Sequence, residues 1–142
     1  MYLRAEAGLH QILDELRQLE PIFHTKRFGL TAEERERRVA PDYWEVGASG
    51  RRYTRAFIMD MLVKQPPVDA DEAGWRAWDF GLRQLGPAAI YLVTYSLDQA
   101  GRITRRATVW HKAEQEWRIL YHQGTGVAEK DAPDSEPLDS GQ

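Results

Sequence analysis

The chain has 142 residues, 42% of them hydrophobic and 29% charged, which is typical of one ordinary globular domain. Its net charge of -3 argues against nucleic acid binding, which needs a clustered basic surface, and the absence of cysteine excludes disulfides and thiolate zinc sites. Residues 1–9 lack the apolar core of a signal peptide, and no apolar run reaches the roughly 20 residues that span a bilayer. We therefore expect a cytoplasmic protein that binds neither membranes nor nucleic acid.

Helices are predicted mainly in the first half of the chain. Apolar residues at three- and four-residue spacing predict an amphipathic helix over about residues 5–20. Thr31 has the pattern of an N-cap, because two acids follow it in the first turn, and it predicts a charged surface helix to about residue 39. A further helix is expected after Thr54, where the apolar residues of 57–62 keep helical spacing.

Strand patterns dominate from residue 75 onward. Strands are expected at 43–47, 75–85, 88–97, 102–111 and 116–123, with Gly81 as a bulge. Helices followed by such a meander indicate the α+β class, with a curved antiparallel sheet wrapped by N-terminal helices. Residues 128–142 are predicted to form a disordered acidic tail, which leaves one domain over 1–127.

Three segments carry a resemblance to a known family. They are the acid-x-Gly-x-x-Gly segment within 44–50, residues 106–110, and residues 117–125 with their His-Gln-Gly-Thr sequence. Over about residues 10–125 the chain resembles the domain of unknown function 4440 family, a branch of the nuclear transport factor 2-like (SnoaL-like, cystatin-like) superfamily. The resemblance implies a cone that often holds a small molecule, and a homodimer through the outer sheet face. Because members include isomerases, dehydratases, cyclases, binding modules and assembly modules, the resemblance does not choose a function.

Alternation along the strands predicts a polar site inside the cone. Arg106, Thr108 and Trp110 share one face of their strand, and a short turn can bring His122 beside Arg106. In the last strand, alternation places Leu120 with His122 and places Trp117, Ile119, Tyr121 and Gln123 on the opposite face. The residues expected to line the site are Tyr43, Glu45, Tyr95, Arg106, Thr108, Trp110 and His122.

The chemistry of this set leaves several functions open. An enclosed carboxylate and guanidinium must pair, and a neighbouring histidine could move a proton near neutral pH. The leading hypothesis is a small-molecule-binding domain with an unidentified ligand and no cofactor. In an enzyme, His122 or Glu45 would act as general base and Arg106 would stabilise negative charge, in a cofactor-free isomerisation or dehydration. The alternatives are a structural Glu-Arg-His network and a protein-interaction or assembly module.

Two further expectations concern partners and metals. Aromatic residues on both parities between Trp75 and Tyr95 indicate burial on both sheet faces, so we expect a second copy to cover the outer face as a homodimer. The histidines have no metal-ligand spacing, and no metal site is expected.

Overall fold

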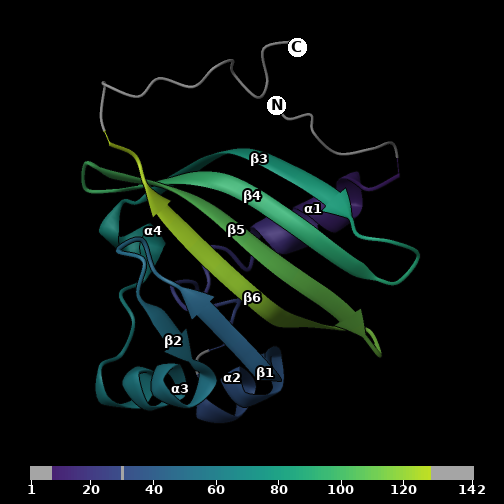
Figure 1. Ribbon diagram of the computed structural model, residues 1–142, viewed down its shortest axis with the longest axis horizontal. Helices are drawn as coiled ribbons and strands as arrows, with labels where there is room; N and C mark the ends of the chain where they lie inside the picture. The colour runs from purple at the N-terminus through teal and green to yellow at the C-terminus, as the bar shows by residue number, and fades with distance from the viewer. Residues whose placement is uncertain (1–7, 30, 129–142) are drawn as a thin grey trace.

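A six-stranded curved sheet, in the order β2-β1-β6-β5-β4-β3, organises the computed structural model (Figure 1). The structure describes residues 8–29 and 31–128. The strands are β1 (Val39–Val46), β2 (Arg52–Thr54), β3 (Arg76–Gln84), β4 (Ile90–Gln99), β5 (Arg102–Ala113) and β6 (Glu116–Gly126). The expected tail lies outside the described residues from position 129 onward.

One strand pair departs from the expected antiparallel arrangement. Neighbouring strands run antiparallel except β1 and β6, which run parallel. Two parallel strands cannot be joined by a tight hairpin and need a crossover. Here the chain passes through two helices and four more strands before β6 arrives beside β1. The α+β class is confirmed, and one pair of the sheet is parallel.

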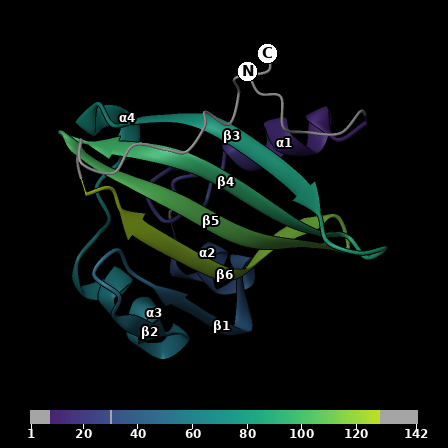
Figure 2. The same ribbon diagram turned by 45° about the horizontal axis from the view of Figure 1, so that its top comes forward.

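In the described part of the chain, four short helices accompany the sheet: α1 (His10–Arg17), α2 (Ala32–Arg38), α3 (Arg55–Lys64) and α4 (Ala70–Ala73). α1 lies behind β3 and β4 in both views (Figures 1 and 2). It buries Leu13 and Leu16, as its apolar spacing predicted, but it ends at Arg17. Residues 18–29 therefore form a loop, and this loop carries part of the candidate site described below.

The helix caps form as their sequences indicated. The Thr31 hydroxyl accepts a hydrogen bond from the Glu34 backbone N–H (3.1 Å), and the Glu34 carboxylate accepts one from the Thr31 backbone N–H (3.0 Å). This capping box starts α2, which buries none of its residues. Thr54 caps α3 by accepting from the backbone N–H of Phe57 at 3.2 Å.

β3 is irregular where Gly81 predicted a bulge. The pairing of β3 with β4 shifts between Trp78 and Gly81, and Asp79 adopts a φ of 63°. The bulge bends the strand, so that Phe80 packs inward and stacks on Tyr95 with ring centroids 4.8 Å apart.

A second bulge, in β6, was not predicted. Ile119 and Tyr121 pair with consecutive residues of β5, which leaves Leu120 between them without a partner in that ladder. The extra residue changes the alternation, so that Trp117, Ile119 and His122 are all buried. The prediction that Trp117 and Ile119 lie opposite His122 is therefore wrong, because a strict two-residue period does not hold across a bulge.

The apolar core lies between α1, the loop after it and the concave face of the sheet. Its aromatic centre is Trp110, which lies 6.1 Å from Phe28 and 6.5 Å from Trp117 between ring centroids. Glu15 of α1 ties the helix to this cluster, because its carboxylate accepts a hydrogen bond from Nε1 of Trp117 at 2.9 Å. None of the described helices is both long enough and apolar enough to cross a membrane.

Candidate functional site

Glu20 lies in the loop after α1 and is 6% exposed. Its carboxylate accepts hydrogen bonds from the Tyr95 hydroxyl (2.6 Å) and from Nε1 of Trp110 (3.0 Å), and the Thr108 hydroxyl is a third partner. Burial raises the pKa of the Glu20 carboxyl to about 7, although each of these hydrogen bonds acts to lower it. Glu20 can therefore exist in both protonation states near neutral pH.

His122 lies next to this group on β6 and is 3% exposed. Its Nδ1 is 2.7 Å from Oγ1 of Thr108, and its Nε2 is 3.4 Å from a guanidinium nitrogen of Arg106. Burial, followed by the neighbouring guanidinium, lowers the pKa of His122 to about 3. The imidazole is thus neutral at physiological pH, and its ring nitrogens act as one donor and one acceptor.

Arg106 is held by neutral groups. Its guanidinium donates to Oγ1 of Thr104 (2.8 Å) and to Oε1 of Gln99 (3.3 Å). Within the described part of the chain no ion pair joins Arg106 to Glu20 or Glu45. The expected direct pair with a carboxylate is therefore not formed, although the positive charge acts at longer range to lower the pKa of both acids.

A second acid lies on the other side of His122. Glu45 is opposite His122 in the parallel pairing of β1 and β6, and its carboxylate accepts a hydrogen bond from the Tyr43 hydroxyl. Burial raises the pKa of Glu45 above its ordinary value. Two carboxyl groups, one from the loop after α1 and one from β1, thus lie near a neutral imidazole, and each has a tyrosine donor.

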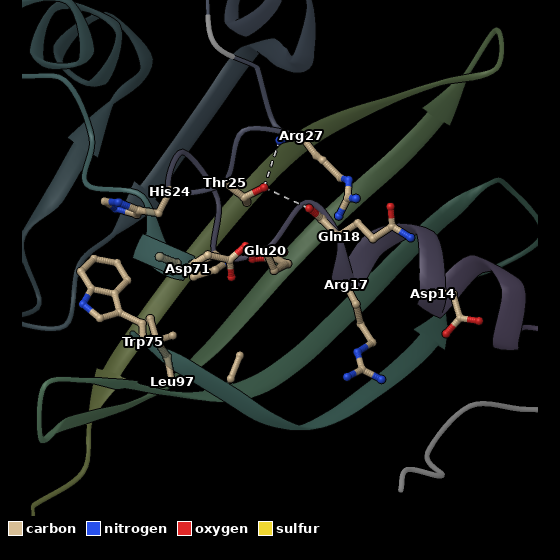
Figure 3. A pocket seen from close by; sticks show the side chains of 13 residues that line it. Asp14, Arg17, Gln18, Glu20, His24, Thr25, Arg27, Asp71, Trp75 and Leu97 are labelled. Carbon is tan, nitrogen blue, oxygen red and sulfur yellow. Dashed lines mark hydrogen bonds between the residues drawn. The ribbon is translucent and has the colours of Figure 1, made fainter. Parts of the chain in front are cut away.

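A pocket of about 520 Å³ opens beside Glu20 (Figure 3). It lies between the end of α1 with its loop and α4 with the start of β3, and Leu97 of β4 also contributes. We call it the Glu20 pocket; its lining residues are Asp14, Arg17, Gln18, Glu20, Pro21, His24, Thr25, Arg27, Ala70, Asp71, Trp75, Ala77 and Leu97. In the close view, His24 and Trp75 lie on one side of Glu20, and Arg17 and Arg27 lie on the other.

His24 forms part of the aromatic wall of the Glu20 pocket. Its ring meets Trp75 edge-on with centroids 5.0 Å apart, and its Nδ1 lies 2.8 Å from the carbonyl oxygen of Val68. Because a carbonyl only accepts, Nδ1 carries the proton and Nε2 is an acceptor in the neutral ring. Burial lowers the pKa of His24, which favours this neutral form. The described residues contain no group of three or more histidines and acids placed to hold a metal ion.

The structure divides the predicted site residues into two groups. Tyr95, Arg106, Thr108, Trp110 and His122 surround Glu20 or each other, whereas the Tyr43–Glu45 pair lies beyond His122. Yet none of these seven residues lines the Glu20 pocket. They form the layer behind it.

Sequence reasoning missed the residues that do line the Glu20 pocket. Glu20 and His24 lie in a loop that has no periodic pattern, so alternation could not assign them to a face. One signal was present: Glu20 is an acid within the otherwise apolar run 19–23, and such an acid is a candidate for burial.

Solved structures share this fold at low sequence identity. A nuclear transport factor 2-like protein from Cytophaga hutchinsonii aligns with a TM-score of 0.64 and 14% identity, over 86% of this chain and 100% of that one. A protein of unknown function of the DUF3225 family from Pectobacterium atrosepticum gives a TM-score of 0.62 and 15% identity, over 87% and 94% of the two chains. A protein provisionally assigned as a ketosteroid isomerase, from Parabacteroides distasonis, gives 0.63 and 12%, over 89% and 96%.

No protein-family model and no curated protein matches the sequence. The structural matches define the fold as the cone of nuclear transport factor 2-like and cystatin-like proteins. At these identities they show the fold alone, so the activity has to be argued from the site.

Proposed function

We propose that this protein binds a small molecule in the Glu20 pocket, with Glu20 as its main polar contact. The observation that carries the proposal is a buried carboxyl group that lines a pocket of about 520 Å³ and has no ion-pair partner among the described residues. Such a group is costly to bury, and a purely structural role could be filled by a neutral side chain. A core filled by side chains would instead have favoured the assembly role.

The residues predicted from alternation take a different part in this proposal. Tyr95, Thr108 and Trp110 hold the Glu20 carboxylate. His122 is hydrogen-bonded to Thr108, and Arg106 contacts His122 in turn. The Tyr43–Glu45 pair provides a second acid beside His122. The motifs within 44–50, 106–110 and 117–125 support assignment to the domain of unknown function 4440 branch of the superfamily.

A specific observation favours an enzyme as the second candidate. The pKa of Glu20, raised to about 7, suits a group that accepts and returns a proton at neutral pH. In this version Glu20 replaces Glu45 and His122 as the general base of a cofactor-free isomerisation or dehydration. His122 is unsuited to that task, because its pKa lies near 3.

The binding proposal is tested with a fragment library observed by ligand-detected NMR. Wild-type protein should bind a subset of small polar fragments. Glu20→Gln should lower the affinity for those fragments by about 10-fold or more, because a hydrogen bond to a charged group is lost. Glu33→Gln is the matched control, because Glu33 is exposed on α2 and lies outside the Glu20 pocket. Fragments whose affinity is equal in the two variants would exclude Glu20 as the contact.

The proposed homodimer uses the outer face of the sheet. Trp44 is 49% exposed there and meets Tyr121 edge-on with ring centroids 5.0 Å apart, and such a patch favours association with a second copy. Trp44→Lys should convert the dimer to a monomer in sedimentation velocity, because it places a charge in the interface. The control is Val63→Lys on α3, at a residue 68% exposed. A wild-type protein that sediments as a monomer would contradict the proposal.

A further inference from the structure

The hydrogen bonds that lead to Glu20 run in one direction. Arg106 carries only donors, and one of its terminal nitrogens lies 3.4 Å from Nε2 of His122. Nε2 must therefore accept, because a proton on it would face another N–H. The neutral ring then carries its proton on Nδ1, which lies 2.7 Å from Oγ1 of Thr108.

The direction continues through Thr108 to the carboxylate. Because Oγ1 of Thr108 accepts from His122, its hydroxyl hydrogen is free to be donated to Glu20. The Trp110 indole can only donate, and the Tyr95 hydroxyl supplies the third hydrogen. A carboxylate offers about four acceptor positions, so these three donors leave about one. Since Glu20 lines the pocket, that position is available to a ligand.

We infer that Arg106, His122 and Thr108 are positioning residues that make Glu20 an acceptor, so that the Glu20 pocket takes an uncharged ligand with an O–H or N–H donor. This inference rests on the proposed function. Apart from Glu20, the charges that line the pocket cancel, because Arg17 and Arg27 are balanced by Asp14 and Asp71, so the rim adds no net charge that would select an ion. Trp75, Ala77 and Leu97 supply apolar surface for the body of the ligand. An alcohol or an amide has this chemistry, and a carboxylate or a ketone does not.

The first test reads the proton on His122 directly. In protein with ¹⁵N-labelled histidine, long-range ¹H–¹⁵N spectra distinguish the two neutral forms of the ring. We expect the Nδ1–H form for His122, and Arg106→Met should allow the Nε2–H form to appear. An Nε2–H ring in the wild type would overturn the proposed direction of the hydrogen bonds from Arg106 to Glu20, and this result does not depend on any ligand.

The second test measures how the hydrogen bond from Thr108 changes the titration of Glu20. Thr108→Val should shift the Glu20 titration, followed by ¹³C NMR of the carboxyl carbon, upward by about one pH unit, because one donor to the ionised form is lost. Thr108→Ser should restore the wild-type titration, because it keeps the hydroxyl. An unchanged titration in Thr108→Val, or no restoration by Thr108→Ser, would show that Thr108 does not position Glu20.

The third test uses cyclohexanol and cyclohexanone, two probes of matched size, at about pH 8.5, where Glu20 is ionised. Tyr43 and Tyr95 stay protonated there, and His24 and His122 stay neutral, so Glu20 sets the preference. Protein-detected NMR should show cyclohexanol binding about 10-fold tighter, the worth of one hydrogen bond to a charged group. Equal affinity would overturn this inference alone. Binding of neither probe would overturn it and would count against the proposed function as well.

Discussion

The two faces of β5 and β6 are built from neighbouring residues but carry opposite kinds of chemistry. The inner face buries Thr108, Trp110 and His122, whereas the outer face presents Tyr121 beside the half-exposed Trp44 of β1. The inner face therefore buries polar groups beside its aromatic core, although their burial is costly, whereas the outer face leaves the Trp44 ring half-exposed. This contrast is in keeping with the ligand site proposed on the inner side and with the homodimer surface proposed on the outer face.

The difference in burial between the two faces is tested most directly at Trp110 and Trp44. Trp110 is fully buried and donates to Glu20, so Trp110→Ala should lower the free energy of unfolding by about 4 kcal/mol. Trp44→Ala, at a residue 49% exposed, should cost less than about 1 kcal/mol in the monomer. Urea denaturation at low protein concentration measures both variants. Similar losses would mean that the two faces do not differ in burial as described.

A second experiment sharpens the comparison through pH. Burial raises the pKa of Glu20 from 4.5 to about 7, so the stability from its proton is present below pH 4.5 and is lost as the pH rises through 7. Over this range the free energy of unfolding of the wild type should fall relative to that of Glu20→Gln by about 3 kcal/mol. Denaturation at a series of pH values measures the difference, and parallel profiles for the two proteins would contradict the assignment.

His122 should act in the opposite sense over an overlapping range. Its pKa is lowered from 6.5 to about 3, so its stability is present above pH 6.5 and is lost as the pH falls through 3. Between pH 4.5 and 6.5 the Glu20 and His122 contributions cancel. In Glu20→Gln the Glu20 contribution is removed and the His122 contribution remains, so the stability of that variant should rise with pH over this interval relative to that of the wild type.

The smallest expected effect compares two threonines of the same sheet. Thr108→Val keeps the shape of the side chain but removes partners from His122 and Glu20, and it should cost about 1–2 kcal/mol. Thr125→Val, at an exposed position of β6, should change the free energy of unfolding by less than about 0.5 kcal/mol. Thermal unfolding with both variants checks the difference. A Thr108→Val protein as stable as Thr125→Val would show that the buried hydrogen bonds contribute nothing net.

The sequence predicted well wherever a local rule decides the structure. Thr31 and Thr54 cap their helices because a hydroxyl that accepts from a first-turn N–H has the same geometry in any fold. Along β5, strict alternation put Arg106 and Thr108 on the concave face, and both contact His122 in the structure.

The pocket was beyond such rules because its chemistry comes from a loop. Glu20 belongs to no periodic element, and it meets Trp110 only through the packing of two segments 90 residues apart. The parallel pairing of β1 with β6 is equally non-local, since it depends on where the intervening chain returns. Periodicity therefore predicted the layer behind the pocket and did not predict the residues that line it.

The unpaired Leu120 has a consequence for how related sequences should be compared. Odd-numbered Trp117 and Ile119 and even-numbered His122 all face inward because one surplus residue separates them. Removing that residue would move each later side chain of β6 to the opposite face of the sheet, so that the Tyr121 ring would face inward and the His122 imidazole outward. The extra residue thus shifts the alternation between the buried apolar and the buried polar part of β6, and an ungapped alignment across this point would compare inward positions with outward ones.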